Sequence, residues 1–325
     1  MRLQKCRPLE RLIFGVNKKS SGLQFWKTGV SFCESTRKGV RKMPDEEKWI
    51  DLHTHSTASD GSDTPSELAE KMCASCLAAG ALTDHDTVSG LEEFLRASEE
   101  KGFFGIPGVE LSTRLRGKEI HIVGLFIDFT SGELVKFLQA RREERLRRNT
   151  EMIRKLRENG YEITEEEVHA EAGGESVGRP HMARVLLAKG YFSEMRDVFS
   201  RCLGRNAPCY VPRASVTPEE AIRVILASGG LAVWAHPILS ASTRSAMRRV
   251  LRELVPAGLS GLETRYSLYR ESDRAAAKAV AAEFGLLESG GSDYHGVNQP
   301  GIELGRKLEI PYGDLEKMLK KLGRS

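Results

Sequence analysis

The chain has 325 residues, of which 40% are hydrophobic and 29% are charged, and its formal net charge is +4. This composition is typical of a globular protein with one large α/β domain or two medium domains, and it excludes a disordered or fibrous protein. No apolar run approaches the roughly 20 residues that cross a bilayer. We therefore expect no membrane-spanning segment and no membrane partner.

Basic residues are concentrated at the N-terminus. Residues 1–42 contain 11 Lys and Arg against two Asp and Glu, a net charge of +9, whereas the rest of the chain carries −5. An Arg-rich, acid-poor stretch is typical of a transit peptide or of an arm that binds nucleic acid. We favour an upstream extension or a mis-assigned start, because Met43 directly precedes the first strand-like segment. Residues 1–46 are thus interpreted as a basic N-terminal extension of doubtful order.

The six cysteines show no spacing typical of a small disulfide-bonded domain, and their use fits a reducing cytoplasm. We therefore predict a cytoplasmic protein. Cys73 and Cys76 resemble half of a zinc ribbon, but no second pair follows. We interpret both as buried positions of a helix.

Short apolar segments alternate with helical segments from Trp49 onward, which indicates a parallel α/β architecture, either open or closed into a barrel. Residues from about Leu134 to Asn206 are almost entirely helix-like and interrupt this alternation. We therefore predict one α/β domain, in parts 47–133 and 216–325, split by a helical insertion over 134–215. Strands are predicted over 49–53, 81–84, 104–110, 119–126, 230–236, 261–263 and 286–290, and helices over 65–79, 91–101 and 218–228.

Histidines and carboxylates follow these strands. Six of the eight histidines lie on or just after a predicted strand, whereas chance would scatter them. In a parallel α/β fold the C-terminal strand ends meet on one face, where active sites form. Imidazole with carboxylate is the ligand set of Zn²⁺, Mn²⁺ and iron in hydrolases, so we predict a multinuclear metal site. The residues concerned are His53, His55, Asp60, His85, Glu110, His121, His236, Asp293 and His295.

Six short segments resemble the polymerase and histidinol phosphatase (PHP) superfamily. They are His53-Thr54-His55-Ser56 with Asp60-Gly61, Leu82-Thr83-Asp84-His85, Gly108-Val109-Glu110, Glu119-Ile120-His121, Ala235-His236-Pro237 and Gly291-Ser292-Asp293-Tyr294-His295. The insertion, with Gly178-Arg179-Pro180-His181, is similar to the branch of nucleoside-phosphate phosphatases and RNA 5′-end trimming enzymes. The resemblance implies a distorted (β/α)₇ barrel with a helical insertion domain and three divalent ions.

The resemblance also implies which residues hold each ion. The first ion would be held by His53, His55, Glu110 and Asp293, the second by Glu110, His121 and His236, and the third by Asp60, His85 and His295. Many members of the superfamily have histidine where this chain has Asp60. Its harder oxygen ligand favours Mn²⁺ or Fe²⁺ over Zn²⁺ at the third position.

A phosphate ester is hydrolysed slowly unless the catalyst generates hydroxide at neutral pH and neutralises charge on the phosphoryl group. Clustered divalent ions do both. We hypothesise that a bridging hydroxide attacks phosphorus in line and that Asp293 accepts its proton. A protonated histidine, His236 or His295, would assist the leaving alkoxide.

Three residues are predicted to contact the substrate. The resemblance implies that Arg179 and His181 of the insertion face the pocket and bind phosphate, although Arg179-Pro180-His181 could merely begin a helix. Arg265, shortly after a strand end, is a second candidate for phosphate, and a surface salt bridge is the alternative.

We favour a metal-dependent phosphoesterase that acts on AMP or a nucleoside 3′,5′-bisphosphate and releases inorganic phosphate. A 5′-to-3′ exonuclease on short RNA would use the same site, so the expected partner is a nucleotide or a short oligonucleotide. Histidinol phosphatase is disfavoured by the insertion and by Asp60. A non-catalytic module, in which the metals only stabilise the fold, is disfavoured because the ligand set is complete. No stable protein partner is evident.

Overall fold

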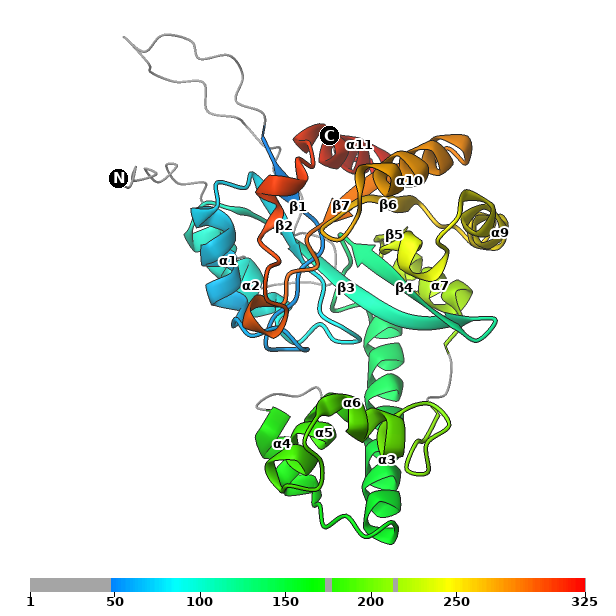
Figure 1. The fold of residues 1–325 in the computed structure, drawn as a ribbon. Helices are drawn as coiled ribbons and strands as arrows, with labels where there is room; N and C mark the ends of the chain where they lie inside the picture. Colours follow the sequence, from blue (N-terminus) through cyan, green and yellow to red (C-terminus); the bar gives the residue numbers. More distant parts are fainter. Residues whose placement is uncertain (1–47, 173–176, 213–215, 325) are drawn as a thin grey trace.

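A computed structural model describes residues 48–172, 177–212 and 216–324 of the chain (Figure 1). The predicted N-terminal extension, 1–46, lies outside the described residues. Within them, no helix combines the length and the apolar character needed to cross a membrane.

Seven strands form one sheet whose spatial order follows the chain order, β1 to β7. The strands are β1 (Ile50–Asp51), β2 (Ala79–Leu82), β3 (Phe104–Leu115), β4 (Lys118–Leu125), β5 (Leu231–Trp234), β6 (Gly261–Tyr266) and β7 (Leu287–Gly291). The helices outside the insertion are α1 (Pro65–Ala74), α2 (Leu91–Glu100), α7 (Pro218–Ala227), α8 (Pro237–Ser240), α9 (Arg244–Leu254), α10 (Glu271–Glu283) and α11 (Tyr312–Lys321), with 3₁₀ turns at Gly296–Asn298 and Gly305–Leu308. The arrangement confirms the predicted α/β barrel with seven strands.

The first and last strands come together and nearly close the sheet into a barrel. The Leu52 amide donates to the Gly290 carbonyl at 3.1 Å, and the Asp293 amide donates to the His53 carbonyl at 2.8 Å. Gly291 permits this approach, because a Cβ there would lie 2.1 Å from the His53 Cβ. Closure thus brings the residues after β1 against those after β7.

One strand runs against the predicted parallel direction. β4 is antiparallel to both β3 and β5, while the remaining pairs are parallel. The reason is local: Arg116 and Gly117 both have positive φ, at 52° and 80°, and two such residues form the tight turn of a β-hairpin. β3 therefore turns directly into β4 with no crossover helix between them.

The strands alternate between two hydrophobic clusters. In β4, Ile120 and Ile122 pack in the cluster that also holds residues of α1, α2, α7 and α9. Val123 and Leu125 pack instead in a second cluster with Leu315 and other residues of α11, which closes one end of the barrel. The barrel core therefore lies between α11 and the strand ends that carry the predicted ligands.

The first helix is shorter than predicted. Thr64 caps it in a capping box with Glu67, and Pro65 occupies the first turn. The helix ends at Ala74, and β2 begins two residues earlier than predicted. Cys73 is therefore a partly buried helix residue, but Cys76 lies beyond the helix, exposed and with φ of 57°, which corrects the prediction that both cysteines are buried helix positions.

Between β4 and β5 the described residues contain helices and no strand. These helices are α3 (Gly132–Glu158), α4 (Glu165–Ala172), α5 (Arg179–Ala188), α6 (Met195–Val198) and a π-helical segment (Phe199–Leu203), followed by α7. α3 extends away from the barrel, and α4, α5 and α6 pack beside its far half (Figure 1) around a separate apolar cluster. Arg145 of α3 contacts Asp86, which follows β2, at 2.7 Å and so links this segment to the barrel.

Candidate metal centre

The nine predicted ligands come together at one end of the barrel. The alternation of side chains along a strand explains part of this. His121 lies on the same face of β4 as the interior residue Val123, and Glu110 lies on the same face of β3 as the interior residue Ile106. Both side chains therefore face the barrel interior. Since β4 is antiparallel, it is the first half of this strand, rather than its end, that lies beside the last part of β3, with His121 opposite Ser112.

Glu110 lies at the centre of the cluster, fully buried. Its Oε1 lies 2.9 Å from His121 Nδ1 and 3.0 Å from His236 Nε2. Its Oε2 lies 2.8 Å from His85 Nδ1 and 3.4 Å from the Nε2 atoms of both His53 and His55. Five imidazoles thus converge on one carboxylate, which is the arrangement expected of a bridging ligand.

Three groups of donor atoms could each hold a cation. They are His53, His55, Glu110 and Asp293; His55, Asp60, His85 and His295; and His85, Glu110 and His121. The first group matches the predicted first set, and the second contains the predicted third set with His55 added. The third contains Glu110 and His121 of the predicted second set, and His236 reaches the same Glu110 oxygen as His121.

Buried polar atoms without hydrogen-bond partners show that these residues fit divalent metal ions. Within the cluster these atoms are His53 Nε2, both ring nitrogens of His55, His85 Nδ1 and Glu110 Oε2. A buried polar atom normally has a partner, because leaving it without one costs about 1–3 kcal/mol. These five atoms belong to four candidate ligands that lie in the same cluster. Nitrogen and oxygen donors together suit Mn²⁺, iron or Zn²⁺.

The pKa values of the histidines in the cluster shift in different directions, according to whether imidazoles or carboxylates lie beside them. Burial lowers the pKa of His55 to about 4, and the neighbouring His295 and His85 add to this effect. Burial also opposes protonation of His121 and His295, but Glu110 raises the pKa of His121 to about 10 and Asp60 raises that of His295 to about 9. Cations bound here would displace protons from such imidazoles, so metal binding is expected to release protons.

Backbone strain accompanies the cluster. His236 and Asp293 have φ of 31° and 57°, a left-handed conformation that costs a non-glycine residue about 1–3 kcal/mol and that is concentrated at functional sites. Hydrogen bonds hold both residues in place. The Asp293 amide donates to the His53 carbonyl, and the His236 amide donates to Glu263 Oε2 at 2.6 Å.

Two residues of β6 contact the ligands, although no role was predicted for them. Glu263 Oε1 accepts a hydrogen bond from His53 Nδ1 at 3.1 Å. The Tyr266 hydroxyl donates to Asp293 Oδ2 at 2.9 Å, which leaves Oδ1 facing His55 Nε2 at 3.0 Å. The one signal in the sequence is an acidic residue in a strand otherwise expected to be buried.

Arg265 is not brought to the cluster, in contrast to its predicted contact with substrate. Its guanidinium binds Asp314 of α11 at 3.0 Å and lies 3.5 Å from Glu288, as in the salt-bridge alternative. A β-bulge between Glu263 and Arg265 is the reason. The extra residue reverses the alternation, so that Tyr266, rather than Arg265, shares the inward direction of Glu263.

Arg179 and His181 begin α5, as the alternative interpretation of this segment expects. The Arg179 guanidinium packs over the rings of Phe199 and Tyr210, 5.7 and 5.4 Å from their centroids, and donates to the Leu203 carbonyl. His181 Nδ1 accepts from the Gly178 amide. Burial, and then Arg184, lower the pKa of His181, while Glu171 and Asp60 oppose this shift.

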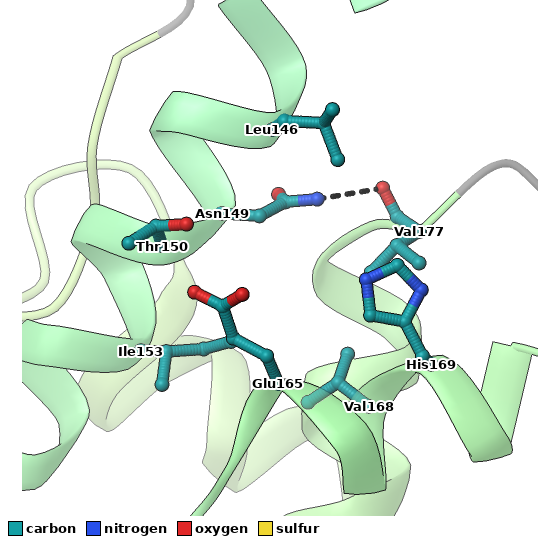
Figure 2. A pocket seen from close by; sticks show the side chains of 8 residues that line it. All are labelled: Leu146, Asn149, Thr150, Ile153, Glu165, Val168, His169 and Val177. Carbon is teal, nitrogen blue, oxygen red and sulfur yellow. Dashed lines mark hydrogen bonds between the residues drawn. The ribbon is translucent and has the colours of Figure 1, made fainter. Parts of the chain in front are cut away.

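A cavity in the insertion is too small for a substrate. It lies between α3 and α4 and measures about 20 Å³ (Figure 2), whereas a single water needs about 10–15 Å³. His169, for which no role was predicted, points into it from α4. The lining residues are Leu146, Asn149, Thr150, Ile153, Glu165, Val168, His169 and Val177.

Comparison with known proteins agrees with this geometry. The family model described as the PHP domain matches residues 51–212. The "5'-3' exoribonuclease Rnm" of Escherichia coli is 37% identical over 267 residues, covering 81% of this chain and 90% of that protein. The "3',5'-nucleoside bisphosphate phosphatase" of Chromobacterium violaceum is 34% identical over 263 residues, covering 81% and 92%. A solved structure described as a metal-dependent phosphoesterase, from Bifidobacterium adolescentis, superimposes with a TM-score of 0.72 at 30% identity, covering 84% of this chain and 96% of that one.

The barrel, the ligand cluster and these relatives define a metal-dependent phosphoesterase, an enzyme that hydrolyses phosphate esters. The chain belongs to the PHP domain family.

Proposed function

We propose that this phosphoesterase acts on a nucleoside phosphate, AMP or a 3′,5′-bisphosphate, and releases inorganic phosphate. The observation that carries the proposal is the convergence of nine imidazole and carboxylate ligands in one cluster with Glu110 at its centre. The relative from Chromobacterium violaceum named as a bisphosphate phosphatase supports the substrate class.

We assign three divalent ions to the ligand sets predicted from the sequence, with Mn²⁺ or Fe²⁺ favoured over Zn²⁺ at the set that contains Asp60. Ions bound there would lower the pKa of water from about 15.7 toward 7 and would neutralise charge on the phosphoryl oxygens. Side chains of the protein would carry out the proton transfers and bind the substrate.

In this proposal Asp293 accepts the proton of the attacking water. Tyr266 holds Asp293 Oδ2, so Oδ1 remains directed at the cluster. A rim histidine, His236 or His295, donates a proton to the leaving oxygen. Their side chains are 12% and 13% exposed, whereas those of His53 and His55 are at most 1% exposed, so His236 and His295 can reach a leaving group outside the cluster and His53 and His55 cannot.

We propose that the insertion, residues 134–215, supplies substrate contacts through Arg179 and His181. The rings of Phe199 and Tyr210 would restrain the Arg179 guanidinium while leaving N–H donors for a phosphate.

A second candidate is 5′-to-3′ exonuclease activity on short RNA at the same site. The Escherichia coli relative with that name is 37% identical, slightly more than the phosphatase. Both activities require hydrolysis of a phosphate ester beside the cluster, so they differ in the substrate and not in the ligands.

Release of phosphate by the Mn²⁺-loaded protein tests the proposal. The substrates are AMP, adenosine 3′,5′-bisphosphate, histidinol phosphate and a 5′-phosphorylated RNA oligomer, and His55→Ala is the inactive control. We expect release from a mononucleotide that the control lacks. Stepwise loss of mononucleotides from the oligomer would favour the exonuclease, and bound metal with no turnover of any ester would contradict both candidates.

A further inference from the structure

Glu263 lies directly behind the metal ligands, on β6, and its side chain is 3% exposed. It is not among the described residues that form the three candidate cation groups. Each of its carboxylate oxygens instead contacts a predicted ligand. Oε1 accepts from His53 Nδ1 at 3.1 Å, and Oε2 accepts from the His236 backbone amide at 2.6 Å.

The first contact selects the tautomer of His53. A neutral imidazole carries a proton on one nitrogen and a lone pair on the other, and a carboxylate at Nδ1 holds the proton there. The lone pair of Nε2 is then free for a cation. Nε2 is buried without a hydrogen-bond partner and lies 3.4 Å from both Glu110 Oε2 and Asp293 Oδ1, as a ligand atom of the first group should.

The second contact restrains a strained backbone. His236 has φ of 31°, and its amide at the end of β5 is held by Glu263 rather than by a neighbouring strand. In this conformation His236 Nε2 reaches Glu110 Oε1 at 3.0 Å. A change in the His236 backbone would move this nitrogen away from the second predicted ligand set.

We infer that Glu263 is a positioning residue that fixes the tautomer of His53 and the backbone of His236, and thereby organises two metal positions through one carboxylate. The inference rests on the proposed metal site. It adds a residue outside the three candidate cation groups that orients two ligands, one following β1 and one following β5.

The variant Glu263→Gln tests this inference, because it keeps the shape of the side chain and removes the charge. Glu288→Gln is the matched control: Glu288 lies on the adjacent strand β7, and its carboxylate faces Thr264, Arg265 and Lys278, away from the cluster. Mn²⁺ affinity is measured by chelator competition, and Mn²⁺ content by elemental analysis, on the full chain. We expect affinity to fall about 10- to 100-fold for Glu263→Gln and to stay at the wild-type value for Glu288→Gln.

A spectroscopic readout separates positioning from a general loss of stability. In metal-free protein labelled with ¹⁵N-histidine, the His53 signals, assigned by their loss in His53→Ala, report which ring nitrogen carries the proton. Burial opposes protonation of His53, but Glu110 raises its pKa well above the ordinary value, so the spectra are recorded at alkaline pH, where the ring is neutral. We expect the Nδ1–H form in the wild type and a mixture of tautomers in Glu263→Gln. Glu263→Asp keeps the charge on a shorter side chain, so its Mn²⁺ affinity should lie between those of the wild type and Glu263→Gln.

Wild-type affinity and an unchanged His53 tautomer in folded Glu263→Gln would overturn the inference. If that variant does not fold, wild-type affinity in folded Glu263→Asp would overturn it equally. Failure of the wild type to bind Mn²⁺ would instead overturn the metal site itself, so failure of the inference and failure of the proposed function are distinguishable.

Discussion

The substitution Glu110→Gln tests the centre of the cluster. Glu110 is fully buried, and nitrogen atoms of five histidines lie 2.8–3.4 Å from its two oxygens. Glutamine has nearly the same shape but no charge. It also places an N–H donor where one of these oxygens accepts from imidazoles or would bind a cation.

The size of the effect follows from burial. Removing one partner of a buried charge pair costs about 3–5 kcal/mol, because the other charge is left uncompensated. At about 1.4 kcal/mol for each factor of ten, this corresponds to a loss of about 10²- to 10⁴-fold in metal affinity. Glu110 contributes to two of the three candidate groups, so at least two ions should be affected together.

Elemental analysis and chelator competition on wild type, Glu110→Gln and Glu288→Gln measure this loss, and phosphate release from the best substrate measures its consequence. We expect substoichiometric metal and less than about 1% of wild-type turnover for Glu110→Gln. The control should retain both. A full metal complement bound with wild-type affinity by Glu110→Gln would refute a bridging role for this carboxylate.

Three further outcomes are expected. Asp51→Ala removes a buried acceptor of three backbone amides, those of His53, Ser292 and Gly305, so urea denaturation should show about 3 kcal/mol less free energy of unfolding; an unchanged value would show that closure of the barrel does not depend on these bonds. Tyr266→Phe removes the hydrogen bond to Asp293 Oδ2, so kcat should fall about 10-fold with KM nearly unchanged. A change confined to KM would contradict an effect on Asp293. Burial raises the pKa of Cys202 to about 12, so this thiol stays protonated below pH 9 and should resist alkylation, while the exposed Cys76 reacts. Peptide mapping after iodoacetamide treatment measures the labelling of both cysteines. Equal labelling would contradict the burial of Cys202.

Much of the metal centre was predictable from the sequence, because the ligands stand on or next to strands. His53-x-His55 follows β1 and Asp293-x-His295 follows β7, and closure of the barrel between these strands brings both pairs together. The helix caps are also local features: Thr64 and Thr217 each form a capping box with a glutamate three residues later. Such features depend on a few neighbouring residues, so they can be recognised without the fold.

Only the tertiary structure decided on which face of a strand a side chain lies and which distant residue it contacts. The bulge in β6 turns Arg265 toward Asp314 and Tyr266 toward Asp293, and one inserted residue is enough to exchange the two faces of a strand. The role of Glu263 is equally nonlocal, because it lies 210 residues from His53 and its contact exists only after β1 and β6 enter the same barrel. The sequence alone therefore determined which chemical groups make up the candidate metal centre, whereas the fold determined which side chains hold those groups in place.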